Sequence, residues 1–377
     1  MVTRSVAIIG TRGYPSYYGG FETLVRRLAP YLAGSGWSVT VYGRAAAAAT
    51  KASERDPRVN VLNTWGIETK SLSTLTYGLS STASALARKP DVALIMNVAN
   101  GYWLPMLKAA NIPSVLNVDG IEWERAKWGA AAKSIFRIGA TMTAKFADHL
   151  VYDSPEIQRR WERDFGRSGT YIPYGGDVVG DLGPVDGLER GAYALLVARF
   201  VPENTVPEFL EAAREISRNY DVVIVGSSGY GGAIEDEVQA LVDTNPRVRW
   251  MGHVSDDLRL FSLWRNAGAY FHGHSVGGTN PALVQAMACG APIVARDTPF
   301  NRHVLGAAGE FCSPNPSDIA SAVLNLLKNN VRQEAYGEAA QRRAAESFGW
   351  EQVCASYEAT LASAIAASTS GIHAARR

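Results

Sequence analysis

The sequence contains only three cysteines, Cys289, Cys312 and Cys354, which lie far apart and form no Cys-x-x-Cys pair. Isolated thiols predict neither a disulfide framework nor a cysteine-based metal site, and they are typical of buried, reduced residues in a cytosolic protein. The sequence also lacks an apolar run of membrane-spanning length, and its first twenty residues do not have the layout of a signal peptide. We therefore expect a cytoplasmic protein.

A strong excess of either charge is absent too, because the formal net charge is +1. This balance argues against a general nucleic-acid-binding protein. The charges are unevenly distributed: residues 1–178 contain 21 Lys and Arg against 14 Asp and Glu, whereas residues 179–377 contain 16 against 22. The basic first half would suit an anionic partner, such as a phosphorylated substrate or a membrane surface, and accidental surface composition explains it equally well.

Short apolar runs alternate with helical stretches along the chain. These runs are too apolar for half-exposed strands, which is typical of parallel sheets covered by helices on both faces. A first series of strands is predicted at 5–10, 38–42, 59–62, 91–96, 113–118 and 149–152, and a second at 193–198, 221–226, 248–252, 269–273 and 291–295.

With 377 residues the chain is too long for one ordinary core, so we expect two Rossmann-like α/β domains. We predict the first at 1–178, a linker at 179–189, and the second at 190–349. The carboxyl edges of two facing parallel sheets would border one central cleft. A last helix at about 350–368 follows the completed second sheet, and we expect it to pack back on the first domain.

The opening loop GTRGYPSYYGG, residues 10–20, follows the first strand and leads into an amphipathic helix. A glycine-rich turn at this place usually brings a phosphorylated group close to the backbone. The spacing of its glycines does not match the dinucleotide fingerprint, which argues against an NAD-type oxidoreductase. The loop therefore predicts phosphate binding without identifying the ligand.

The segment GGTNPALVQAMACG, residues 277–290, carries the clearest local signal. Asn280 is a suitable N-cap and Pro281 fits the first helical position. Gly277 and Gly278 would let an anion approach the free N–H groups of the helix start. The alternative is a tight strand-to-helix turn with nothing bound.

Three motifs together resemble a known family: SVGGTNPALVQAMACGAPIVA, VARFVPEN and YIPYGGD. They are similar to the retaining glycosyltransferases of family 4, which have the GT-B fold. The opening loop, with VNVDGIEWERAKW, resembles the bacterial rhamnosyltransferase-like subgroup that builds cell-surface polysaccharides. The resemblance implies a transferase that moves a sugar, with dTDP-rhamnose as the leading donor, onto a lipid-diphosphate-linked or growing saccharide.

The resemblance also implies roles for single residues. Arg199 matches the arginine that clamps the donor diphosphate, whereas the lysine usually found with it is replaced by Asn204. Arg12 is a candidate for the missing charge. Gln285 matches the second Glu of the family's Glu-x7-Glu motif, which binds the ribose, and Gly277 matches the first. The predicted nucleotide-sugar contacts are Arg12, Gly13, Gly19, Gly20, Asn204, Gly277, Gly278, Thr279, Asn280 and Gln285, with Arg199 and Asp119 as catalytic residues.

Asp119 matches the position where many family members have a histidine beside the reacting sugar. A carboxylate there would accept the acceptor's proton or stabilise an oxocarbenium-like transition state, and the alternative is a helix cap. Glu122, His272 and His274 are second-tier candidates. No His, Cys and Asp cluster has metal spacing and no Asp-x-Asp occurs, so the resemblance implies a metal-independent enzyme without a cofactor.

Residues 121–146 mix tryptophan, isoleucine and phenylalanine with arginine and lysine. This composition suits contact with an anionic membrane or a lipid-diphosphate acceptor, and an ordinary domain helix explains it equally well. Two other functions stay open: a nucleotide-sugar epimerase or hydrolase on the same fold, and a catalytically silent nucleotide-sugar-binding subunit. The second is favoured by the departures at Gly277, Asn204 and Gln285.

Overall fold

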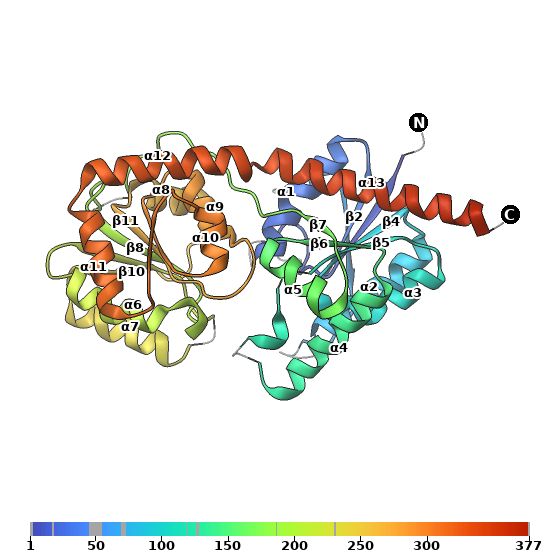
Figure 1. Ribbon diagram of the computed structural model, residues 1–377, viewed down its shortest axis with the longest axis horizontal. Helices are drawn as coiled ribbons and strands as arrows, with labels where there is room; N and C mark the ends of the chain where they lie inside the picture. Colours follow the sequence, from blue (N-terminus) through green and yellow to red (C-terminus); the bar gives the residue numbers. More distant parts are fainter. Residues whose placement is uncertain are drawn as a thin grey trace. The chain divides into compact units, whose positions relative to one another are not determined.

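A computed structural model describes residues 3–16, 19–44, 55–68, 73–118, 120–125, 128–185, 187–229 and 231–375. The chain divides into two compact units, Met1–Pro173 with Glu351–Arg377, and Tyr174–Trp350. The segment 179–189, predicted as a linker, lies inside the second unit. Each unit is an α/β fold built on one parallel sheet (Figure 1).

The sheet of the first unit has seven strands in the order β3-β2-β1-β4-β5-β6-β7, and every pair is parallel. Six of the strands coincide with predicted ones. The seventh, β7, has two residues and carries too short a pattern to be predicted. The strands are β1 (Ser5–Ile9), β2 (Ser38–Arg44), β3 (Val59–Thr64), β4 (Val92–Met96), β5 (Ser114–Asn117), β6 (His149–Tyr152) and β7 (Thr170–Tyr171).

The helices of the first unit include the last helix of the chain. Helix α13 continues to Ala375, beyond the predicted end at 368, and Asn117 of β5 donates a 2.6 Å hydrogen bond to the hydroxyl of Tyr357 on it. Trp37 likewise donates to Glu358 at 2.9 Å. The helices are α1 (Gly20–Gly34), α2 (Ser73–Arg88), α3 (Leu104–Ala109), α4 (Ala130–Phe146), α5 (Pro155–Phe165) and α13 (Trp350–Ala375).

The sheet of the second unit has six parallel strands in the order β10-β9-β8-β11-β12-β13. Successive residues of its strands enter different apolar clusters: Leu195 and Tyr270 belong to one, Leu196 and Phe271 to the other. Both faces of the sheet are therefore covered, as the continuous apolar runs predict. The strands are β8 (Tyr193–Val197), β9 (Asp221–Val225), β10 (Val248–Trp250), β11 (Ala269–His272), β12 (Ile293–Arg296) and β13 (Glu310–Cys312).

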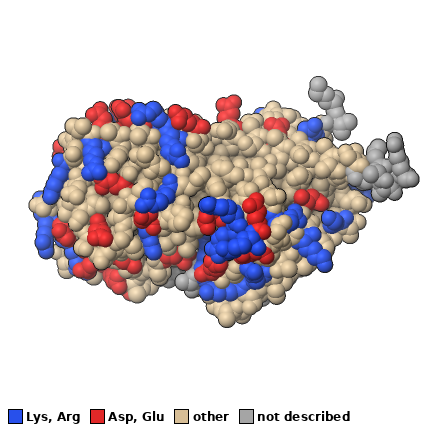
Figure 2. All heavy atoms as spheres, viewed as in Figure 1, with Lys and Arg blue, Asp and Glu red and all other residues tan. Residues whose placement is uncertain are grey.

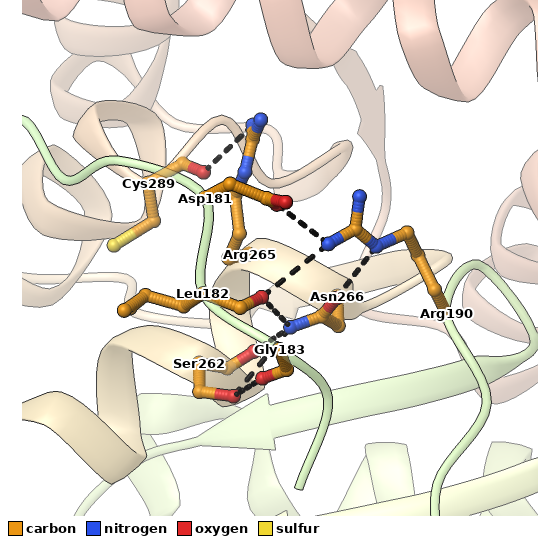
Figure 3. Close-up of polar contacts among 8 residues, drawn as sticks. All are labelled: Asp181, Leu182, Gly183, Arg190, Ser262, Arg265, Asn266 and Cys289. Carbon is orange, nitrogen blue, oxygen red and sulfur yellow. Dashed lines mark hydrogen bonds and ion pairs between the residues drawn. The ribbon is translucent and has the colours of Figure 1, made fainter.

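Seven helices are seen in the described part of the second unit: α6 (Val206–Ile216), α7 (Ala233–Thr244), α8 (Asp257–Asn266), α9 (Pro281–Ala288), α10 (Pro299–Leu305), α11 (Pro316–Leu327) and α12 (Asn330–Ser347). Residues 179–189, which precede β8, are held against α8 by hydrogen bonds (Figure 3). Asn266 donates to the carbonyl of Leu182 at 3.0 Å and Ser262 donates to that of Gly183 at 2.5 Å. The guanidinium of Arg190 donates hydrogen bonds to the side chains of both Asn266 and Asp181. These contacts hold the predicted linker against its own unit.

The strand order reverses at one place in each sheet, between β1 and β4 in the first unit and between β8 and β11 in the second. Open parallel sheets bind ligands beyond the carboxyl ends of the strands at such a reversal. The loops that follow β1, β8 and β11 are those that hold most of the predicted site residues. The topology thus points to the same loops as the motifs.

Acidic and basic side chains are intermixed on the visible face (Figure 2). The arginines of α5 illustrate this, because Arg159, Arg160 and Arg163 each have a carboxylate partner. Among the described residues, no helix is long and apolar enough to cross a membrane.

Candidate functional site

Two loops of the second unit are joined where the strand order reverses. After β8, the side chain of Asn204 is buried and donates to the carbonyl of Arg199 at 2.9 Å. The next residue, Thr205, is fully buried in a left-handed conformation (φ 58°) and donates to the carbonyl of Gly273 at 2.5 Å. The loop after β8 is therefore fixed to the loop after β11, while the Arg199 side chain stays exposed.

The turn after β11 has the predicted helix start. Asn280 is the N-cap of α9, its side chain accepts a 3.0 Å hydrogen bond from the amide of Ala282, and Pro281 is the first helical residue. This prediction is confirmed. Gly277 has φ +115°, a conformation that side-chain-bearing residues rarely adopt, so the backbone here suits glycine and not the family's glutamate. Thr279 is buried in the same turn.

Gln285, predicted at the ribose, has both side-chain amide atoms bonded to the backbone of Asp177. Its Nε2 donates to the Asp177 carbonyl at 2.8 Å and its Oε1 accepts from the Asp177 amide at 2.9 Å. A third, longer contact of 3.5 Å runs from Nε2 to the sulfur of Cys289. Gln285 thus ties the YGGD segment to α9, and only the second lone pair of Oε1 is left for a ligand.

His272 and His274 lie together at the end of β11. Their rings are stacked with centroids 4.4 Å apart, and Nδ1 of His272 is 2.9 Å from the hydroxyl of Tyr270. Burial, with the nearby His274 ring, holds the pKa of His272 well below its usual value. Its Nε2 is buried and has no hydrogen-bond partner among the described residues.

Arg296, at the end of β12, is not among the predicted site residues, yet its side chain reaches the same loops. The guanidinium donates to Thr205 at 2.9 Å, and the backbone carbonyl accepts from the side chain of Asn301 at 2.8 Å. Asn301 also donates to the carbonyl of His274 at 2.9 Å. An arginine that directly follows a predicted strand was the only available signal, because the contacts join three separate loops.

In the first unit, the opening loop is fixed against β2 and α1. The Arg12 amide donates to the buried Glu22 at 3.2 Å, and the Arg12 carbonyl accepts from the Arg44 amide at 3.1 Å. A Cβ on Gly43 would lie 2.8 Å from the Cα of Gly13, so the two segments approach at glycines. Gly19 has extended backbone (φ −168°) and Gly20 begins α1, so neither needs glycine for its conformation.

A small hollow lies beside this loop, lined by Gly10, Thr11, Gly43, Arg44, Thr74, Tyr77, Gly78 and Ser81. Arg44 lies over the Tyr77 ring at 5.1 Å and its side chain is 14% exposed, with Glu68 3.7 Å away. Burial and the charge of Arg12 lower the pKa of Arg44. Two arginines therefore lie near each other at the loop, one of them predicted and one missed.

The predicted acid–base residue Asp119 lies outside the described residues. Glu122 is described, is buried, and forms a 2.7 Å ion pair with Arg125. It also accepts a 2.8 Å hydrogen bond from the indole of Trp128. Glu122 thus fixes the segment after β5, and its carboxylate is already neutralised by an arginine.

Comparison with known proteins agrees with this architecture. Residues 186–343 match the family described as glycosyl transferases group 1, and residues 19–175 match the glycosyl transferase 4-like domain. The chain thus contains two segments that match glycosyltransferase domain families. The match over residues 186–343 contains Arg199, the Gly277–Asn280 turn and Arg296, and the match over residues 19–175 contains Arg44 and Glu122.

Two curated relatives are mannosyltransferases by name. A phosphatidyl-myo-inositol mannosyltransferase of Mycobacterium tuberculosis is 30% identical over 224 residues, which is 55% of this chain and 59% of that protein. The O-antigen chain mannosyltransferase B of Escherichia coli is 28% identical over 169 residues, or 42% of each chain. The chain thus spans less than two thirds of the relatives it matches.

Solved structures match over nearly the whole chain. Sucrose-phosphate synthase from Thermosynechococcus elongatus superposes with a TM-score of 0.82 at 18% identity, covering 97% of this chain and 100% of that one. Anabaena Alr3699/HepE, solved with UDP, has a TM-score of 0.74 at 16% identity, covering 96% and 100%. These similarities confirm the predicted GT-B fold.

Proposed function

We propose that the protein transfers a sugar from a nucleotide-diphosphate donor, with retention, onto a lipid-linked or growing saccharide in cell-surface polysaccharide synthesis. One observation carries the proposal: in the domain that matches glycosyl transferases group 1, the exposed Arg199 and the N-terminus of α9 both lie at the reversal of strand order. Arginine guanidinium groups and the free N–H groups at helix N-termini commonly bind phosphate in proteins.

The proposed donor is dTDP-rhamnose, on the strength of the opening loop and the VGGTNP turn. A mannose donor is the competing choice, because the curated relatives are named mannosyltransferases. Thermal stabilisation by a panel of dTDP-, GDP- and UDP-sugars ranks these donors. Stabilisation by a GDP- or UDP-sugar alone would replace rhamnose and leave the transferase proposal standing.

Transfer itself is tested with membrane-extracted lipid acceptors and the donor that stabilises the protein most. Arg199→Ala and Asp119→Ala are each expected to abolish transfer with an unchanged melting temperature. Arg214→Ala is the matched control, because Arg214 is an exposed arginine on α6, paired with Glu211. Full activity of both site variants would refute the residue assignment. Full activity in excess EDTA is expected for the metal-independent mechanism that we propose.

A catalytically silent nucleotide-sugar-binding subunit is a second candidate, because Gly277 provides no carboxylate in the conformation observed. Stabilisation by a donor without transfer to any acceptor would favour it. A control reaction with donor alone separates both proposals from an epimerase or hydrolase, since only the latter consumes donor without an acceptor.

Contact with an anionic membrane, on the cytoplasmic face of the plasma membrane, is a separate part of the proposal. Helix α4 leaves Ile138 53% exposed next to Arg137, and Lys145 lies further along the same helix. Sedimentation with phosphatidylglycerol vesicles, but not with phosphatidylcholine vesicles, is the expected result. Ile138→Asp should reduce this binding, and equal binding to both vesicles would refute the electrostatic contribution.

A further inference from the structure

Two arginines of the second unit carry positive charges without a carboxylate partner. Within the part of the chain that the structure describes, neither Arg199 nor Arg296 forms an ion pair. The carboxylate next to Arg296 is unavailable, because Asp297 is bound by both Nε and Nη2 of Arg302 at 2.5 and 2.7 Å. Arg296 is partly buried, and a partly buried charge without an ionic partner is costly. The side chain of Arg296 therefore favours an anionic ligand beside it.

The position of Arg296 relates it to the lysine that this chain lacks. Its Nη1 donates to Thr205, the residue after Asn204, and Thr205 in turn donates to Gly273. Asn204 itself cannot supply a charge, and its buried amide is used to hold the Arg199 carbonyl. The guanidinium of Arg296 therefore lies beside the turn from which the family's lysine would extend.

The sheet order places the two arginines around one strand. Arg199 follows β8 and Arg296 ends β12, and β11 lies between these strands. Two strand spacings correspond to about 10 Å between backbones, a distance that two arginine side chains bridge easily toward one diphosphate. The α9 N-terminus belongs to the loop after the middle strand, β11.

We propose that Arg296 supplies the second positive charge for the donor's diphosphate, in place of the missing lysine, with Arg199 as the first. This inference rests on the proposed nucleotide-sugar function. It assigns Arg296 a direct contact with phosphate oxygens and leaves Asn204 and Thr205 the task of holding the two arginine-bearing segments together.

The test uses UDP, GDP and dTDP as probes, with affinities measured by calorimetry on the full chain. Arg296→Gln removes the charge and keeps an N–H donor for Thr205, so a purely structural role would be preserved. We expect the variant to bind the tightest of the three diphosphates at least about tenfold more weakly, with the affinity for the free nucleoside unchanged. Its affinity should also depend less on ionic strength than that of the wild type.

Arg296→Lys keeps the charge and should retain most of the affinity. Arg214→Gln is the matched control, since it removes an exposed positive charge from the same unit and should leave affinity unchanged. Wild-type-like affinity and salt dependence in Arg296→Gln would overturn this inference alone. If the wild-type protein binds none of the three diphosphates, the proposed function fails with it.

Discussion

The side-chain amide of Gln285 is hydrogen-bonded at both ends to the backbone of Asp177, as acceptor at 2.9 Å and as donor at 2.8 Å. One residue of α9 therefore fixes the chain segment that enters the second unit, 108 positions earlier in the sequence. A glutamate, the family's usual residue here, could accept the first of these bonds but could not donate the second.

Gln285→Glu is therefore expected to destabilise the second unit by about 1–3 kcal/mol, because the Asp177 carbonyl loses the hydrogen bond from Nε2 and faces a carboxylate oxygen instead. Guanidinium unfolding, followed by a probe placed in the second unit, measures the effect. Gln352→Glu on the exposed face of α13 is the control and should change little. Unchanged stability together with tighter nucleotide binding would show that position 285 serves the ribose instead.

Introducing the family's glutamate at position 277 is expected to destabilise the protein and not to increase its activity. The φ of +115° is poorly accessible to any residue with a Cβ, so Gly277→Glu and Gly277→Ala should each cost about 1–2 kcal/mol. Gly180→Ala is the matched control, because Gly180 has open space around it. A Gly277→Glu variant that is as stable as the wild type and more active would contradict the backbone argument.

Stability should decrease below about pH 6.5 through His272. Its pKa is depressed in the folded protein, so the unfolded chain binds a proton at a pH where the native side chain stays neutral. The stabilisation is complete above the unfolded value and is lost as the pH falls. Unfolding free energies at pH 7.5 and 5.5 should differ more for the wild type than for His272→Gln. Equal differences would exclude His272 as the titrating group.

Tyr357→Phe is expected to weaken the packing of α13 on the first unit. The hydroxyl accepts the 2.6 Å hydrogen bond of the buried Asn117 side chain, and the substitution removes this buried hydrogen bond, at a cost of about 1–3 kcal/mol. Hydrogen exchange of the α13 amides is the appropriate measurement, because the chain has two units and need not unfold in one step. Faster exchange is expected in α13 and not in α12. Unchanged exchange in α13 would mean that its other contacts are sufficient.

Much of the fold follows from local patterns. Eleven predicted strands occur in the structure, because runs such as VALIM and YALLV are apolar on every residue and suit only a sheet covered on both faces. The edge strands β7 and β13 were missed, with two and three residues, since such short strands form only against an existing neighbour. The local composition of residues 179–189 predicts a linker. The contacts that hold this segment in the second unit come from α8, about 80 positions away, and a local pattern does not reveal them.

The candidate site likewise combines features that the sequence predicts with contacts that it does not predict. The sequence alone determined the start of α9, since an Asn-Pro cap acts within four residues, and it determined that Arg199 and the glycine-rich turns follow strands. Tertiary packing was needed to bring Gln285 to Asp177 and Arg296 to Thr205. Helix caps and strand periodicity are set by neighbouring residues, whereas these partners meet only when separate loops converge at one edge of a sheet.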